Sequence, residues 1–284
     1  MEQQIKFTKM HGLGNDFMVI DAINQQIDLN ETLIQKWSDR YFGLGFDQLL
    51  LVEESNKADF KYRIFNADGS EVEQCGNGAR CFAKYVFDKG LTNQIEIEVE
   101  TLSGIITLLL VGDDQVQVNM GLPNFSPQSL PFNFAVEQDI YSIDIDLGRS
   151  QMDSVNIGAV SVGNPHAVLI VDDIEHAPVS EWGEKIESHS LFPERVNVGF
   201  AQIVSDSQIN LRVYERGAAE TLACGTGACA AMVVLKKRQL LQSDVVTVSL
   251  PGGDLIIEWN GNIDSPIMMT GPAESVFDGV IDFE

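Results

Sequence analysis

The sequence has few basic residues and no long apolar run. Its 284 residues include 18 Lys and Arg against 42 Asp and Glu, which gives a formal net charge of −24. Such an acidic chain repels nucleic-acid phosphates and anionic lipids, so we expect neither a nucleic-acid nor a membrane partner. The most apolar run, residues 105–111, is far shorter than the roughly 20 residues that span a bilayer.

The sequence is also poor in cysteine and lacks a targeting segment. The start, Met1-Glu2-Gln3-Gln4, has neither the basic nor the apolar stretch of a signal peptide, which predicts a cytoplasmic protein. Thiols stay reduced there, so the four cysteines are expected to be reactive, metal-binding or buried rather than disulfide-bonded. The mean hydropathy is zero and 44% of residues are hydrophobic, as in globular proteins. The length favours two domains.

One sequence pattern occurs twice, 149 residues apart. Cys75-Gly76-Asn77-Gly78-Ala79 returns as Cys224-Gly225-Thr226-Gly227-Ala228. The same offset aligns further pairs, which are Gly14-Asn15 with Gly163-Asn164, Gln48 with Asn197, Arg63 with Arg212, Glu71 with Glu220, and Gly104 with Gly253. Two unrelated Gly-rich loops would not agree over about 90 residues, so the offset indicates an internal duplication.

Each copy predicts a strand, a loop, a helix and further strands, in that order. Residues 60–65 alternate as a strand does, and residues 66–70 are typical of a turn. After Gly78, apolar residues recur at helical spacing: Ala79, Phe82, Ala83, Val86 and Phe87. The helix after Gly227 is apolar on every face, so other elements must enclose it. Further strands are predicted at 95–100, 105–111 and 115–120, and at 245–250, 255–259 and 267–270.

These patterns predict an α+β fold with two pseudo-symmetric domains, each a rolled, mostly antiparallel β-sheet around a central α-helix. The first domain is expected at residues 1–121, with 273–284 packing back on it, and the second at 122–272. The Pro-rich stretch 121–127 marks the expected boundary. A further helix at 31–40, capped by Asn30, is expected to bury Leu33, Ile34 and Trp37.

Both repeated loops place a cysteine at the start of a predicted helix. Backbone N–H groups and the positive end of the helix dipole favour an anion there, which predicts a thiol pKa below the usual value of about 8.5. Two facing domains would put Cys75 and Cys224 on opposite sides of one small ligand. A thiolate and a thiol could then remove a proton from one face of a carbon and return one to the other. This inversion requires no cofactor.

Three other uses of these loops fit the sequence less well. A zinc site would need Cys75, Cys81, Cys224 and Cys229, but the two cysteines of each helix point in different directions and their spacing is unusual for zinc. We therefore expect no metal, and we expect Cys81 and Cys229 to be buried as small apolar residues. A redox pair of Cys75 with Cys224 remains open as a side effect. A nucleotide-phosphate loop lacks the Lys-Ser/Thr that should follow it.

Five stretches resemble the diaminopimelate epimerase family of cofactor-independent amino-acid racemases. They occur in order along nearly the whole chain, at residues 11–17 (HGLGNDF), 66–70 (NADGS), 75–81 (CGNGARC), 163–166 (GNPH) and 215–227 (from ERG to CGTG). The resemblance implies epimerisation of LL-diaminopimelate to meso-diaminopimelate in lysine and cell-wall precursor biosynthesis. It also implies that neither pyridoxal phosphate nor another cofactor takes part.

The resemblance further implies roles for individual residues. Cys75 and Cys224 would be the two acid/base thiols, and His166 and Glu215 would tune or orient them. The reacting carboxylate would be bound by backbone N–H groups in both loops, at Gly76, Asn77, Gly225 and Thr226. The distal end of the substrate would be bound by Arg216, Glu215 and five amides, which are Asn15, Gln48, Asn66, Asn164 and Asn197.

One position departs from the family pattern. Phe277 stands where family members commonly carry a Tyr at a subunit contact. The resemblance still implies a homodimer with Phe277 at the contact, but without the hydrogen bond of a tyrosine hydroxyl.

Three rival functions remain. A sister racemase acting on proline or hydroxyproline would share the fold and the thiol pair, but those enzymes usually carry His where this chain has Asn77. A sister isomerase of the phenazine type lacks the cysteine pair and is therefore disfavoured. A non-catalytic amino-acid-binding protein would need neither thiol, so its binding would survive the loss of both.

Overall fold

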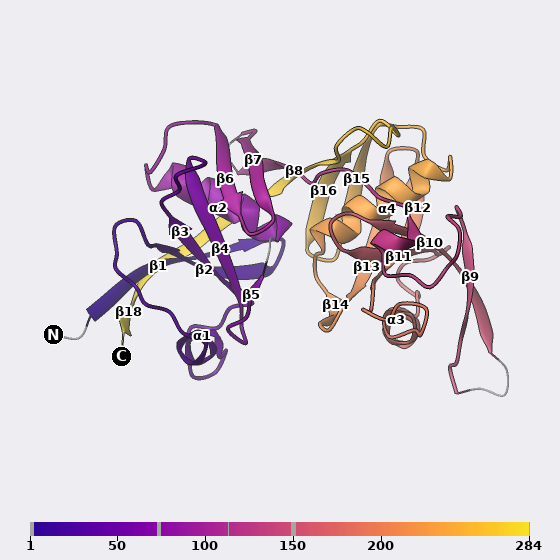
Figure 1. Cartoon of the computed structure of the whole chain (residues 1–284), viewed down its shortest axis with the longest axis horizontal. Helices are drawn as coiled ribbons and strands as arrows, with labels where there is room; N and C mark the ends of the chain where they lie inside the picture. The colour runs from indigo at the N-terminus through magenta and orange to yellow at the C-terminus, as the bar shows by residue number, and fades with distance from the viewer. Residues whose placement is uncertain (1–2, 73–74, 113, 149–151, 284) are drawn as a thin grey trace. The chain divides into compact units, whose positions relative to one another are not determined.

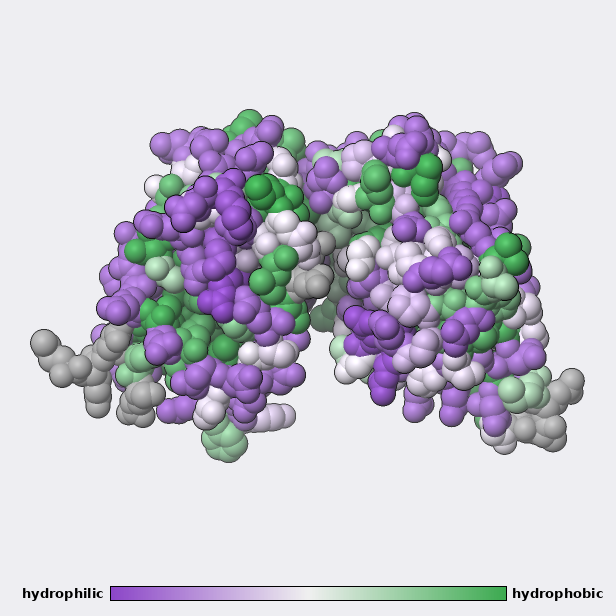
Figure 2. Space-filling view, in the orientation of Figure 1, coloured by the Kyte–Doolittle hydropathy of each residue, from purple (hydrophilic) through white to green (hydrophobic). Residues whose placement is uncertain are grey.

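A computed structural model describes residues 3–72, 75–112, 114–148 and 152–283 of the chain (Figure 1). The chain forms two compact units. Unit 1 comprises Met1–Asn119 and Thr270–Glu284, and unit 2 comprises Met120–Met269. Within the described residues, no helix combines the length and the apolar character needed to cross a membrane. The visible face of each unit is mainly hydrophilic (Figure 2).

Unit 1 is a curved sheet with one helix against its inner face and a shorter helix outside. Its elements are β1 (Gln3–Gly12), β2 (Asn15–Asp21), α1 (Glu31–Ser38), β3 (Gln48–Glu53), β4 (Phe60–Asn66), β5 (Glu71–Val72), α2 (Gly76–Asp88), β6 (Glu96–Thr101), β7 (Gly104–Leu110), β8 (Gln115–Asn119) and β18 (Glu274–Phe283). The strands pair mostly antiparallel; β2–β3 and β4–β6 are parallel. Helix α2 contacts β1, β2, β3, β7, β8 and β18.

Unit 2 repeats this arrangement. Its elements are the short 3-10 helix η1 (Pro127–Ser129), β9 (Tyr141–Ile145), β10 (Asp153–Ser161), β11 (Pro165–Ile170), α3 (Val179–Glu187), β12 (Asn197–Ser205), β13 (Gln208–Glu215), β14 (Ala219–Thr221), α4 (Gly225–Lys237), β15 (Val245–Leu250) and β16 (Gly253–Glu258). Strand β17 (Met268–Pro272) spans the boundary between the units. The parallel pairs are β11–β12 and β13–β15, and α4 contacts β10, β11, β12, β13, β15 and β16.

Strand register in the two units agrees at the offset of 149 residues. Phe17 pairs with Gln48 in unit 1, and His166 pairs with Asn197 in unit 2. Helices α2 and α4 begin and end at equivalent residues, from Gly76 and from Gly225. The predicted α+β fold of two pseudo-symmetric domains is therefore confirmed.

The central helices are buried as their sequences predict. Ten residues of α4 are buried, from Gly225 to Leu235 with the exception of Thr226, so the sheet encloses a helix that has no polar face. Helix α2 buries Ala79, Phe82, Ala83 and Val86, whereas Phe87, included in the predicted apolar pattern, is 40% exposed.

Helix α1 is shorter than predicted. It begins after Asn30, whose side chain accepts from the backbone N–H of Leu33 at 2.9 Å, but it ends at Ser38 instead of residue 40. Asp39 leaves the helical conformation, and its carboxylate accepts from the backbone N–H groups of Tyr41 and Phe42, both at 2.7 Å. This local turn forms in place of a further turn of α1, so the helix ends at Ser38. Helix α3 (Val179–Glu187) was not predicted from the sequence.

Candidate active site

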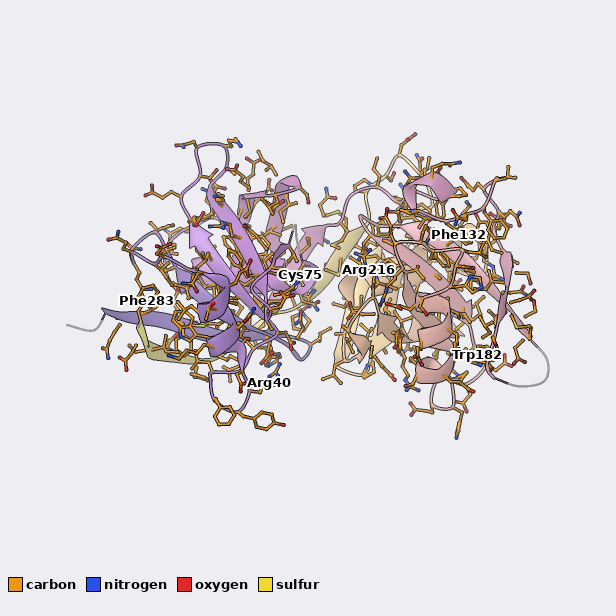
Figure 3. The ribbon with its side chains drawn as sticks, turned by 60° about the horizontal axis from the view of Figure 1, so that its bottom comes forward. Arg40, Cys75, Phe132, Trp182, Arg216 and Phe283 are labelled. Atoms are coloured by element: carbon orange, nitrogen blue, oxygen red, sulfur yellow. The ribbon has the colours of Figure 1, made fainter. Side chains whose placement is uncertain are left out.

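Cys75 lies at the N-cap of α2 in unit 1 (Figure 3). It has extended backbone angles, and its half-buried thiol donates to Oδ1 of Asn15 at 3.6 Å. The first N–H groups of a helix have no acceptor inside the helix itself, so the loop offers donors to an anion. The hydroxyl of Tyr62 donates to the carbonyl oxygen of Cys75 at 3.5 Å. The thiol and the helix start are thus attached to the sheet through β2 and β4.

The predicted amides of unit 1 form two pairs, one of which, through Asn15, contacts this thiol. Asn15 Oδ1 also accepts from Nδ2 of Asn77, at 3.2 Å. Gln48 and Asn66 form a second pair, because Nε2 of Gln48 donates to Oδ1 of Asn66 at 2.9 Å across the β3–β4 pairing. Oδ1 of Asn66 and Oδ1 of Asn15 are acceptors, which are suited to an ammonium group.

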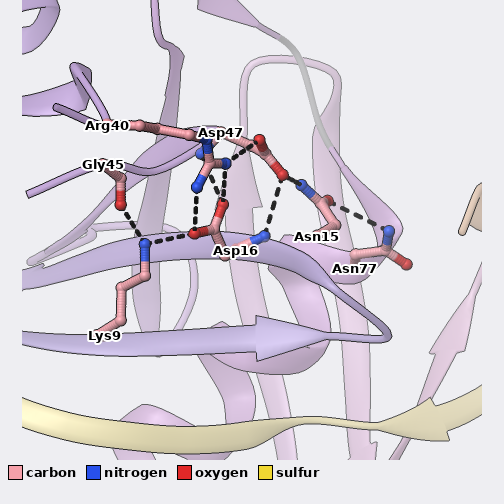
Figure 4. A network of polar contacts seen from close by, with 7 residues as sticks. All are labelled: Lys9, Asn15, Asp16, Arg40, Gly45, Asp47 and Asn77. Carbon is pink, nitrogen blue, oxygen red and sulfur yellow. Dashed lines mark hydrogen bonds and ion pairs between the residues drawn. The ribbon is translucent and has the colours of Figure 1, made fainter. Parts of the chain in front are cut away.

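A cluster of four charged residues supports Asn15 (Figure 4). Nδ2 of Asn15 donates to Asp47 at 2.9 Å, and Asp47 accepts from Arg40 at 2.6 Å. Arg40 also binds both carboxylate oxygens of Asp16, at 2.8 and 3.2 Å, and Lys9 binds Asp16 at 2.5 Å. Burial raises the pKa of Asp16, but hydrogen bonds and charges from Arg40 and Lys9 outweigh it and lower the pKa to about 2.

Cys224 occupies the equivalent N-cap of α4 in unit 2 and is only 4% exposed. Its sulfur lies 3.5 Å from Oγ1 of Thr226 and has a hydrogen bond with the side chain of Glu215. Burial and the negative charge of Glu215 raise the pKa of Cys224 well above its usual value, although Thr226 and the backbone N–H of Gly227 act in the opposite direction. The predicted lowering of this pKa by the helix start is therefore wrong, because desolvation outweighs it.

His166 is fully buried on β11, beside the loop of Cys224. Its Nε2 lies 3.0 Å from Oδ1 of Asn164, and Nδ2 of Asn164 donates to Oγ1 of Thr226 at 3.4 Å. An amide oxygen only accepts, so Nε2 of His166 carries a proton in this pair. Burial, with a smaller effect from the charge of Arg216, lowers the pKa of His166 to about 3. The imidazole is therefore neutral.

Arg216 is exposed at the turn that follows β13 (Figure 3). Its backbone N–H donates to Oδ1 of Asn197 at 2.9 Å, while Nδ2 of the same amide donates to the carbonyl of Pro165. Asn197 is buried, and its side-chain amide binds the backbone of Arg216 at one end and the backbone of Pro165 at the other. The buried carboxylate of Glu187, at the end of α3, accepts from the backbone N–H of Gly217 at 3.1 Å and fixes the same turn.

A family model described as diaminopimelate epimerase matches residues 7–126 and 158–276. Two relatives with this name are similar over nearly their whole length. The one from Nitrosospira multiformis is 54% identical over 282 residues, covering 99% of each chain. The one from Chromobacterium violaceum is 56% identical over 281 residues, covering 98% of this chain and 99% of the relative. The chain belongs to the diaminopimelate epimerase family.

Solved structures with the same fold are less similar to this chain in sequence. A phenazine biosynthesis protein of the PhzF family from Bacillus anthracis has a TM-score of 0.71 at 17% identity, covering 99% of this chain and all of the other. A hydroxyproline epimerase from Agrobacterium vitis has a TM-score of 0.70 at 14% identity, covering 99% and 94%. At these identities the likeness concerns the fold alone.

An ion pair recurs in both repeats of the family fold, next to the cysteine loops. Arg63 binds Glu71 through two hydrogen bonds of 2.7 and 2.9 Å, across β4 and β5. Arg212 binds Glu220 in the same way at 2.6 and 2.9 Å, across β13 and β14. Such two-point pairs fix the relative orientation of the strands. Strands β5 and β14 end three residues before Cys75 and Cys224 in the sequence.

The remaining cysteines lie in the helices. Cys81 and Cys229 are fully buried, as predicted, and burial raises the pKa of Cys81 to about 12. None of the four cysteines forms a disulfide. In the part of the chain that the structure describes, no three His, Cys, Asp or Glu side chains are grouped to hold a metal ion.

Several residues around the site were missed by sequence reasoning. Asp47 holds Asn15, Thr221 donates to Glu215 at 2.5 Å, and Tyr62 contacts the backbone of Cys75. A weak signal existed for Asp47, which directly precedes the predicted Gln48. Nothing in the sequence indicates which carboxylate or hydroxyl meets which side chain.

Replacing Gly78 by alanine is expected to destabilise unit 1 by about 1 kcal/mol. A Cβ here would lie 2.5 Å from the hydroxyl of Tyr62, whose ring is buried and cannot move away. The clash outweighs the gain of about 1 kcal/mol that alanine brings to a helix. Urea titration of Gly78→Ala measures the loss.

The double variant Tyr62→Phe/Gly78→Ala tests this cause. Without the hydroxyl, the nearest atoms to the new Cβ are side-chain carbons of Phe17 and Ile64, at 3.3 and 3.4 Å. In the Tyr62→Phe background the alanine should therefore be neutral or stabilising. An equal loss in both backgrounds would contradict the clash.

Proposed function

We propose that this chain interconverts LL- and meso-diaminopimelate, with Cys75 and Cys224 as the two acid/base groups. Membership of the diaminopimelate epimerase family makes it an isomerase. The observation that carries the two-thiol assignment is that each repeat presents a cysteine at the N-cap of an equivalent helix. A stereocentre that bears a hydrogen needs one acid/base group on each of its faces.

The reaction balances with these two groups alone. One cysteine, as thiolate, removes the α-proton and becomes a thiol, which leaves a carbanion on the α-carbon. The other cysteine, as thiol, donates its proton to the opposite face and becomes the thiolate. The backbone N–H groups of Gly76, Asn77, Gly225 and Thr226 would bind the carboxylate beside the reacting carbon and stabilise the charge that spreads onto it.

The surroundings of Cys224 support its part in this cycle. Glu215 lies within hydrogen-bond reach of the sulfur and can accept a hydrogen bond from the thiol, and Thr226 can donate one to the thiolate that forms during the cycle. The ammonium group of a bound substrate would compensate the negative charge that raises the pKa of Cys224. The lowered pKa makes His166 a weak base, so we assign it the orientation of Asn164 and, through that amide, of Thr226.

The distal end of the substrate would be recognised by a guanidinium and by amides. Arg216 is exposed and suits the distal carboxylate, while Glu215 suits the distal ammonium. The amides proposed to line this part are Asn15, Gln48, Asn66, Asn164 and Asn197. Amino acids without a distal amino-carboxylate group would leave these polar side chains unpaired, which disfavours their binding.

Further parts of the proposal concern the setting of the enzyme. We expect it to act in the cytoplasm, without a cofactor or metal ion and without nucleic-acid or membrane partners. A homodimer is expected to use β18, where the side chain of Phe277 is 50% exposed and packs edge-on against Phe7.

Solvent isotope exchange tests the proposed function. The enzyme is incubated in heavy water with LL-diaminopimelate and, in parallel, with L-proline. Deuterium should enter one α-position of diaminopimelate as the meso isomer forms, whereas proline should neither exchange nor racemise. Exchange into proline would favour the sister racemase. Binding of diaminopimelate without exchange would favour a non-catalytic binding protein.

A further inference from the structure

The amide of Asn15 is held at both of its ends (Figure 4). Nδ2 donates to Oδ2 of Asp47 at 2.9 Å, while Oδ1 accepts from the thiol of Cys75 and from Nδ2 of Asn77. One end of an amide only donates and the other only accepts. Because an ionised carboxylate only accepts, Asp47 requires the NH2 group to face it. The amide oxygen is thereby turned toward the sulfur of Cys75.

Asp47 is itself held in place. Its Oδ1 accepts from Arg40 at 2.6 Å, and its Oδ2 accepts from the backbone N–H of Asp16 at 3.2 Å as well as from Asn15. In turn, the backbone N–H of Asp47 donates to the side chain of Asp16 at 2.9 Å. Both oxygens of Asp47 are used, so its carboxylate cannot turn away from Asn15 without breaking these bonds.

The equivalent amide of unit 2 has the opposite orientation. Asn164 stands 149 residues after Asn15, and its oxygen is taken by Nε2 of His166. Its NH2 group therefore faces Thr226, to which it donates at 3.4 Å. The acceptor Asp47 beside Asn15 and the donor His166 beside Asn164 therefore orient the two side-chain amides in opposite directions. The sulfur of Cys75 meets an amide oxygen, whereas that of Cys224 meets the hydroxyl of Thr226.

We infer that Asp47 is a positioning residue that keeps the proton on Cys75 in the free enzyme. It acts through Asn15, whose oxygen accepts from the thiol and would repel the thiolate. This rests on the proposed function, in which one of the two thiols must start protonated, and it deepens that function by naming the residue that keeps Cys75 in this state. Cys224, whose pKa is also raised in the free enzyme, would become the thiolate once the substrate ammonium compensates the charge of Glu215. Asp47 itself has no part in binding or proton transfer.

In the described part of the chain, two titratable groups interact with Cys75, and neither changes charge between pH 6 and pH 10. Tyr62 on β4 and Cys81 on α2 both interact with it. Burial, with a smaller contribution from Cys75, raises the pKa of Tyr62 well above 10. Cys81, with a pKa near 12, also stays neutral up to pH 10. The cluster of Lys9, Asp16, Arg40 and Asp47 acts on Cys75 through Asn15, whose side chain contacts both Asp47 and Cys75.

The rate of alkylation of Cys75 by iodoacetamide between pH 6 and pH 10 tests the inference, because only the thiolate reacts. Trypsin releases residues 64–80, a peptide in which Cys75 is the sole cysteine, so mass spectrometry follows this thiol alone. In Asp47→Ala the amide of Asn15 can turn its NH2 group to the sulfur. The pKa of Cys75 in the rate profile should then fall by about one unit. The readout requires no epimerase activity, so it stands even if the proposed function fails.

Asp47→Asn separates orientation from charge. An asparagine at this position still offers an oxygen to Asn15, and Arg40, which is half exposed, can move aside. Its Cys75 profile should stay near that of the wild type. Asn15→Ala and Asn15→Ala/Asp47→Ala should give the same profile as each other, because Asp47 then has nothing to orient. Glu100→Ala, which removes a lysine-paired carboxylate elsewhere in unit 1, is the matched control and should leave the profile unchanged.

Three results would overturn the inference. The first is an unchanged profile in Asp47→Ala. The second is an equal fall in Asp47→Asn and Asp47→Ala, which would show an effect of charge alone. The third is a fall on adding Asp47→Ala to Asn15→Ala, which would show that Asp47 acts on Cys75 by another route.

Discussion

Replacing Cys75 or Cys224 by alanine is expected to lower kcat for interconversion of the diaminopimelate isomers by more than about a thousandfold. In the proposed mechanism each thiol serves one face of the α-carbon, as base in one direction and as acid in the other, and alanine can do neither. Each single variant should therefore lose both directions. The double variant should lose little more, because inversion already fails when one group is absent. Chromatographic separation of the isomers measures the rates.

The other two cysteines provide a control in each unit. Cys81→Ala and Cys229→Ala remove a thiol from α2 and α4 at positions that are fully buried. Their kcat should stay within a few-fold of the wild type if the proposed chemistry belongs to the N-cap cysteines alone. A folded Cys75→Ala or Cys224→Ala variant that keeps a tenth or more of kcat would rule out the two-thiol mechanism.

Acid is expected to destabilise the protein through His166. The pKa of this residue is about 3 in the folded protein, against 6.5 for an ordinary histidine. Between these values the unfolded chain binds a proton that the folded chain does not, so stability falls as the pH falls below 6.5. At pH 5 this one group should cost about 2 kcal/mol relative to pH 7.5.

Two variants isolate this effect. His166→Gln keeps a donor toward Asn164 but does not titrate, so its free energy of unfolding should depend less on pH by about 2 kcal/mol over this range. Val168→Ala is the control, since it creates a cavity on the same strand and should lower stability equally at both pH values. Urea titrations followed by tryptophan fluorescence measure both. If His166→Gln keeps the pH dependence of the wild type, His166 titrates normally in the folded protein.

The repeat was the most informative feature of the sequence. Helix starts depend on local features, such as the glycines after Cys75 and Cys224 and the apolar spacing that follows. The α+β class and both central helices could therefore be predicted, and family membership followed from motifs spread along the chain. The end of α1 could not be predicted, because it depends on whether the carboxylate of Asp39 turns back to the next backbone N–H groups.

The candidate site also has features that the sequence predicts and features that depend on the tertiary structure. Which cysteines stand at helix starts is a property of neighbouring residues in the sequence. The direction in which the pKa of Cys224 shifts cannot be predicted from neighbouring residues, because it depends on how completely the sheet buries the sulfur and on how closely Glu215 approaches it. The orientation of Asn15 likewise depends on Asp47, which lies 32 positions further along the chain in a different strand connection.

The linear order of residues was thus enough to reveal two copies of one helix start, each with a thiol, and the class of chemistry that two such groups allow. Folding alone decided the environment of each thiol. An amide oxygen faces the thiol of Cys75, and the half-buried carboxylate of Glu215 faces that of Cys224. Desolvation and hydrogen-bond direction act through space at a few ångströms, and only tertiary packing sets those distances.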